Sequence, residues 1–117
     1  MALRADFRMM NFSEHLGNNA SDLDVPWATF VGNQTTIRNF WVDGRPTSEA
    51  YLILQVYDVD EYGHKILING ADLGGFDIPK RNGWQSWMDA IDTSMLRNGN
   101  NTIQIVRNSN AGDNFVV

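Results

Sequence analysis

Short runs of apolar and β-branched residues alternate with turn residues along most of the chain. Asn-Gly and similar pairs, such as those at 69–70, 82–83 and 98–99, interrupt the runs. Turns about every 8–12 residues are typical of short antiparallel strands. We predict strands over residues 28–31, 35–42, 50–59, 65–69, 102–107 and 115–117. The pattern indicates an all-β fold, an antiparallel two-sheet β-sandwich of about eight strands.

Three segments give sharper local predictions. The run from Tyr51 to Tyr57 is apolar on both alternating faces, which is expected of a central strand in a sandwich. Asn69 and Gly70 between apolar runs favour a hairpin with a two-residue type I′ turn.

The third segment, residues 84–96, has apolar residues at helical spacing, so a short helix is one interpretation. We favour an extended segment through Ile91, followed by a helical turn that Asp92 or Thr93 caps and that stops at Gly99.

Composition and charge narrow the class of protein. With 117 residues, 43% of them hydrophobic, the chain is expected to form one domain, residues 1–117, with an ample core. It contains no Cys, which excludes disulfides, zinc-thiolate sites and cysteine nucleophiles. The formal net charge of −5 argues against a nucleic-acid partner, because such binding depends on clustered Lys and Arg.

The chain shows no feature of a membrane protein. No apolar run approaches the roughly 20 residues that a spanning helix needs. The first ten residues mix charged and apolar side chains and contain no readable secretory signal. We therefore expect a soluble protein without a membrane partner, cytoplasmic, or extracellular if a signal has been removed.

Two motifs add a family resemblance. A strand that ends in Asp58 and Asp60 leads to a hairpin of the form V-x-x-N-G-x-x-L-G, with Ile at its first position, and an L-x-x-G-x-N-x-I-x-I turn and strand follow at 96–105. Residues 49–107 thereby resemble galactose-binding-like jelly-roll domains, which include carbohydrate-binding modules. The resemblance implies that fold and favours carbohydrate binding. The chain also resembles short stand-alone proteins of salt-adapted archaea, with which its excess of Asp over Glu would agree.

The end of the chain departs from that resemblance. In the resembling domains, the stretch that corresponds to residues 113–117 continues into a closing strand, whereas this chain stops at Val117. An uncovered strand edge invites pairing. Its cover is expected from the segment 3–12, from a second copy of the chain, or from residues outside this sequence. We favour self-association into a homo-oligomer, with Phe115 and Val117 at the interface.

The candidate binding residues lie near one end of the expected sandwich. Trp84 follows a polar turn, so its indole can stack on a sugar ring while neighbouring polar groups bind the hydroxyls. We predict a ligand site formed by Trp84, Arg81, Asp58, Asp60 and His64. For Trp84, burial in the core is as well supported by the sequence as a role in binding. For Trp41 and Trp87 core burial is favoured, and Trp27 after Pro26 is interpreted as packing.

Metal binding and catalysis have weaker support. Asp58, Asp60 and Gly63 resemble part of a calcium loop, but Tyr62 and Asn69 stand where oxygen ligands belong, so no cofactor is predicted and structural Ca²⁺ is kept as an alternative. No nucleophile or phosphate-binding motif is present.

Two functional hypotheses remain. One is a non-catalytic module that binds a carbohydrate or a similar small ligand. The other is a structural protein that self-associates through its strand edges.

Overall fold

The alternating pattern is realised as extended strands. The computed structural model describes residues 7–44, 50–74, 76 and 78–117. Within these ranges the strands are β1 (Glu14–Leu16), β2 (Thr29–Gly32), β3 (Arg38–Val42), β4 (Ala50–Tyr57), β5 (Lys65–Ile68), β6 (Ala71–Asp72), β7 (Trp84–Ile91), β8 (Gly99–Val106) and β9 (Phe115–Val116). Two three-residue 3-10 helices are also present, η1 (Ala20–Asp22) and η2 (Thr93–Met95). No helix in these ranges is long and apolar enough to span a membrane.

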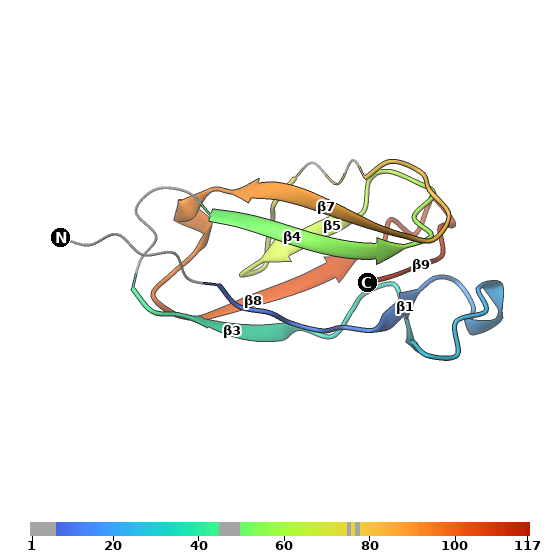
Figure 1. Ribbon diagram of the computed structural model, residues 1–117, viewed down its shortest axis with the longest axis horizontal. Coiled ribbons are helices and arrows are strands. Elements are labelled where there is room, and N and C mark those ends of the chain that lie inside the picture. Colours follow the sequence, from blue (N-terminus) through green and yellow to red (C-terminus); the bar gives the residue numbers. More distant parts are fainter. Residues whose placement is uncertain (1–6, 45–49, 75, 77) are drawn as a thin grey trace.

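The strands form two layers, with β4 and β7 in one and β3 and β8 in the other (Figure 1). One sheet has the order β2-β1-β9-β4-β7 and the second has the order β3-β8-β5-β6. The strand pairs described are antiparallel except for β1 and β2, which are parallel. The predicted all-β two-sheet sandwich is confirmed, with nine strands in the described residues. Each predicted strand range overlaps an observed one.

The core lies between the sheets and is filled by alternate residues of the strands. Ile103 and Ile105 of β8 are buried, while Thr102 and Gln104, which alternate with them, are only half-buried, as predicted for a strand with one solvated face. Burying each large aliphatic side chain stabilises the fold by about 1.5–3 kcal/mol. The other buried residues of the core cluster include Leu16, Leu54, Val56, Val59, Ile66, Ile68, Phe76, Ile78, Ile91, Leu96, Phe115 and Val117.

Strand β4 is internal to its sheet, between β9 and β7, as its apolar sequence predicts. Its two faces nevertheless differ. Leu54 and Val56 point into the core, whereas Tyr51 and Ile53 lie on the outer face, where Ile53 is 69% exposed. Ile53 lies opposite Met88 of β7, which is 61% exposed. The apolar outer side chains of β4 therefore lie on an uncovered face of the sheet.

The Asn-Gly hairpin is confirmed. Ile68 pairs with Ala71, so the loop between β5 and β6 holds two residues. Asn69 and Gly70 have φ angles of 52° and 81°. Positive φ at both central positions is the signature of the type I′ turn, and Asn and Gly adopt it at the lowest cost.

The segment from Trp84 is extended through Ile91, as favoured, and the alternative of a short helix over residues 84–96 is wrong. Asp92 caps η2, because its carboxylate accepts hydrogen bonds from the backbone N–H and the hydroxyl of Ser94. These bonds, the backbone one first, lower the pKa of Asp92. The helical turn ends at Met95, and Gly99 begins the next strand.

Asn69 and Asn101, one from each of the two motifs that carry the family resemblance, form hydrogen bonds within and between turns. Asn101, which is fully buried, accepts the N–H of Arg97 and donates to the carbonyl oxygens of Arg97 and Gly99. Its side-chain oxygen also accepts a hydrogen bond from Asn69. The two motifs therefore meet in one hydrogen-bonded cluster that joins the hairpin to the start of β8.

The end of the chain is covered by its own N-terminal region. β9 lies between β1 and β4, and Glu14 and Val117 exchange backbone hydrogen bonds of 3.1 and 3.0 Å. Phe115 is fully buried and Val117 nearly so. The edge of β9 is therefore covered by β1, which directly follows the segment 3–12, one of the three covers expected from the sequence. The predicted subunit contact through Phe115 and Val117 therefore has no exposed side chain to form it.

Candidate functional site

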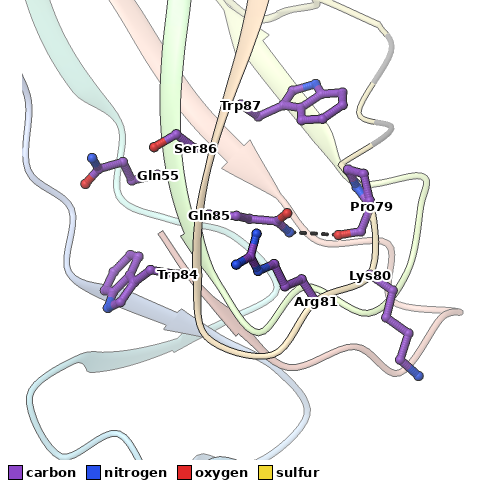
Figure 2. Close-up of a pocket in the computed structure, with 8 residues that line it drawn as sticks. All are labelled: Gln55, Pro79, Lys80, Arg81, Trp84, Gln85, Ser86 and Trp87. Carbon is purple, nitrogen blue, oxygen red and sulfur yellow. Dashed lines mark hydrogen bonds between the residues drawn. The ribbon is translucent and has the colours of Figure 1, made fainter.

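A groove of about 620 Å³ lies at the free edge of β7. Figure 2 shows the side chains of the segment 79–81 on one side and those of the first half of β7 on the other. The groove is lined by Gln55, Pro79, Lys80, Arg81, Trp84, Gln85, Ser86 and Trp87.

Hydrogen bonds to the end of β4 hold the turn that leads into the groove. The backbone N–H of Asp58 donates to the carbonyl of Gly83, and the side chain of Asp58 accepts the N–H of Gly83. Gly83 has a φ of 82°, a conformation that favours glycine. Arg81 N–H donates to the carbonyl of Val59. These bonds fix residues 81–83 to the end of β4, so that Trp84 is held at a defined place on the surface.

Trp84 belongs to an aromatic cluster at the end of the groove. Its ring centroid lies 5.6 Å from that of Trp27 and 5.3 Å from that of Tyr57, and the Trp27 and Tyr57 centroids are 5.4 Å apart. Trp84 is 50% exposed and Trp27 is 49% exposed. Trp27 does pack, as predicted, but half of its surface stays open to solvent. The cluster holds exposed indole surface in place without burying it.

Polar residues of β4 and β7 form one wall of the groove. Gln55 of β4 lies opposite Ser86 of β7, and both are exposed. Gln85 points to the other side of β7, and its amide donates a 2.7 Å hydrogen bond to the carbonyl of Pro79 (Figure 2). This bond ties the segment 79–81 to the strand and so fixes the width of the groove.

Lys80 and Arg81 are the charged residues of the lining, and both are cationic. Neither side chain hydrogen-bonds or pairs with another residue in the described part of the chain. In Figure 2 the guanidinium of Arg81 lies beside Gln85, and Lys80 extends away from it. The groove thus carries two positive charges on a chain whose formal net charge is −5.

The structure brings together two of the five predicted ligand residues, Trp84 and Arg81. Asp58 supports the turn behind them and does not line the groove. His64 is buried in the core, and its ring lies 4.3 Å from that of Phe115. Asp60 is exposed, but it is tied through its backbone N–H to Asp113, beside His64. These three residues are therefore not part of the groove.

Other site residues were missed by the sequence analysis. Gln55 interrupts the otherwise apolar run of β4, which was the available signal for it. Gln85 and Ser86 lie between Trp84 and Trp87 in the sequence and gave no separate signal. Trp87 is half-buried against the core, as favoured. For Trp41 core burial is wrong, since the alternation of β3 turns Phe40 inward and leaves Trp41 60% exposed.

A second polar cluster lies inside the molecule, around Asp113. Its carboxylate accepts the backbone N–H groups of Asp60 and Glu61 and lies 2.8 Å from Nε2 of His64. Because Nδ1 of His64 accepts the N–H of Asn108, Nε2 carries the proton and donates it to Asp113. Both side chains are fully buried. The pair has the elements of an acid–base dyad, but it is closed to substrates.

Metal ligands do not gather in the described ranges, where no three His, Asp or Glu side chains are placed to share one ion. The carboxylate of Asp58 instead satisfies the N–H of Gly83. What the groove offers chemically is therefore exposed aromatic surface, amide groups and two cations.

Comparisons with known proteins place the chain in a family without assigning it an activity. A family model described as a family of unknown function (DUF7383) matches residues 4–117. No curated protein and no solved structure matches the chain.

Proposed function

We propose that this chain, which belongs to the family of unknown function DUF7383, is a non-catalytic binding domain whose groove beside Trp84 recognises a carbohydrate. The observation that carries the proposal is the half-exposed Trp84, held by Trp27 and Tyr57 at the end of a groove with polar side chains in its lining. The resemblance of residues 49–107 to galactose-binding-like domains supports the same class of ligand.

The chemistry of the groove suits a sugar. A pyranose presents a face of C–H groups, which packs on an indole, and a rim of hydroxyl groups, which need hydrogen-bond partners. An apolar surface with a few fixed polar groups is the usual form of a small-molecule site. Gln55, Ser86 and Arg81 supply donors and acceptors around Trp84. Because the turn before Trp84 is already bonded to β4, binding would require little ordering of the backbone.

A glycan array with the full chain tests the proposal, with Trp84→Ala as the test variant and Trp41→Ala as its matched control. Both residues are exposed Trp side chains on strands, but Trp41 lies on the other sheet. We expect the native chain and Trp41→Ala to bind the same glycans, and Trp84→Ala to lose about tenfold or more in affinity. Equal binding by both variants would show that the groove is not the site.

Self-association is the second candidate, and the free edge of β7 favours it. Among the described residues β7 pairs only with β4, which leaves the other edge of an eight-residue strand without a partner. Since Gly83 is bonded to β4, alternation directs the backbone groups of Trp84, Ser86, Met88 and Ala90 toward that free edge. Such an edge is a template for another strand.

A second copy fits this edge. Antiparallel pairing of two β7 strands about Trp87 would place Asp89, the charged residue of the strand, opposite Gln85 of the second copy. The exposed Ile53 and Met88 would lie beside the junction. Sedimentation of the native chain and of Met88→Lys tests this candidate. A dimer that the substitution dissociates supports it, and a monomer at high micromolar concentration contradicts it.

A further inference from the structure

We infer that the ligand of the groove is an acidic saccharide, a sugar chain that carries carboxylate or sulfate groups. This inference rests on the proposed function and makes it more specific. The observation behind it is the contrast between the groove and the rest of the chain: among the described residues the lining contains Lys80 and Arg81 and no acidic residue, whereas the chain has 14 acidic and 9 basic residues.

The two cations remain available to a ligand. Neither Lys80 nor Arg81 forms an ion pair or a side-chain hydrogen bond within the described part of the chain, so neither serves the fold by a contact of that kind. Asp58, whose side chain supports the turn before Trp84, accepts the N–H of Gly83 and is not part of the lining. An anion that enters the groove would therefore meet positive charge without a competing carboxylate among the described residues of the wall.

The geometry suits a planar anionic group next to a sugar ring. The planar guanidinium of Arg81 lies beside the Gln85 amide in the groove (Figure 2), and guanidinium groups bind carboxylates through two parallel hydrogen bonds. Trp84 lines the same groove and offers the face on which the ring can stack. Lys80 extends from the same turn as a second, flexible cation for the next anionic group along the chain.

A nucleic acid could also stack on Trp84 and pair with the two cations, but its binding would need more Lys and Arg residues than the groove holds. A phosphate at every nucleotide draws its affinity from many Lys and Arg residues, and the acidic remainder of the chain would repel it. A saccharide carries at most a few anions within the length of the groove, and two cations are enough to meet them. The charge balance of the protein therefore favours the saccharide.

Titration calorimetry of the full chain with tetragalacturonate and with its fully methyl-esterified form tests the inference, because esterification removes the negative charges and keeps the same sugar chain. We expect the acid to bind at least about tenfold more tightly than the ester, and its affinity to fall when salt rises from about 50 to 200 mM. A sulfated tetrasaccharide shows whether sulfate replaces carboxylate. Preference for any acidic saccharide over its neutral form supports the inference.

The variants are Arg81→Gln and Lys80→Gln, with Lys65→Gln as control, since Lys65 is an exposed cation on β5 of the other sheet. We expect losses of about five- to tenfold for acidic ligands with the two groove variants and none with the control. Equal affinity for acid and ester, with both abolished by Trp84→Ala, would overturn the inference and leave the proposed function intact. Binding of no saccharide would overturn both, and tighter binding of a single-stranded oligonucleotide would overturn the assignment to sugars.

Discussion

The molecule holds two polar clusters, one buried with its groups bonded to one another and one open to solvent. Around Asp113 the carboxylate, His64 and the neighbouring backbone N–H groups are buried and bonded to one another. In the groove, Lys80 and Arg81 stand beside an exposed indole without such partners in the described chain.

The contrast indicates that the buried cluster stabilises the fold, whereas the exposed groove residues are available for binding. A buried polar group that loses its partner cannot bond to water instead, so a break in the Asp113 cluster should lower the free energy of unfolding. A solvated cation on the rim contributes little to the fold. Substitutions in the first cluster should therefore change the free energy of unfolding, and substitutions in the second should change binding alone.

The largest effect is expected for Asp113→Asn. The amide has one acceptor oxygen where the carboxylate has two, and in either orientation its NH₂ group would face the backbone N–H of Asp60, which donates to both carboxylate oxygens. We expect a loss of about 2–4 kcal/mol in the free energy of unfolding, measured by urea denaturation. Asp24→Asn, the same change at an exposed residue, should cost less than about 0.5 kcal/mol. A small effect at Asp113 would show that the internal cluster is not a stabilising unit.

A somewhat smaller loss is expected for Asn101→Ala. The substitution leaves the N–H of Arg97 and the carbonyl of Gly99 without their side-chain partner in a buried place. We expect a loss of about 2–3 kcal/mol. Asn100 is the control because it precedes Asn101 in the chain but is exposed, and within the described residues its side chain bonds only to that of Asn39. If Asn100→Ala were equally destabilising, the buried cluster would not be the cause.

Arg81→Gln should leave stability unchanged within about 0.5 kcal/mol. Its side chain has no partner in the described residues, while its backbone bond to Val59 is kept by any residue other than proline. Urea denaturation of this variant beside Asp113→Asn sharpens the comparison. A large loss would place Arg81 among the residues that hold the fold.

The smallest effect concerns pH and Asp92. The bonds from Ser94 lower the pKa of Asp92 in the folded chain. A lowered folded-state pKa stabilises the fold at pH values above the ordinary range of a free Asp, and this contribution is lost as the pH falls through the folded-state value. Because Asp92 is exposed, the change in melting temperature should be slight. The Asp92→Asn variant should lack it, and a difference between the two chains that grew toward low pH would contradict this sign.

The sequence predicts the local features and not the long-range ones. The Asn69-Gly70 turn and the Asp92 cap depend on neighbours in the chain, so their residue types were sufficient to predict them. His64 and Asp113 are 49 residues apart, and no pattern in the sequence connects them.

The groove also depends on which strands pair and in what register, and the pattern of residues along the chain does not give this. It exists because the register of β4 and β7 sets Gln55 opposite Ser86. Trp84 and Arg81 were predicted from the polar turn, which is local. The partners of Trp84 were not predicted, because Trp27 reaches it from a distant loop.

Mapping of the bound ligand by NMR tests the central claim most directly. In a titration of the ¹⁵N-labelled chain with tetragalacturonate, we expect shifts of the Trp84 indole N–H and of the side-chain amides of Gln55 and Gln85, with the His64 ring unchanged. Shifts at Ile53 and Met88 without any at Trp84, or a loss of the His64 to Asp113 hydrogen bond on binding, would contradict the separation of a recognition groove from a stabilising core.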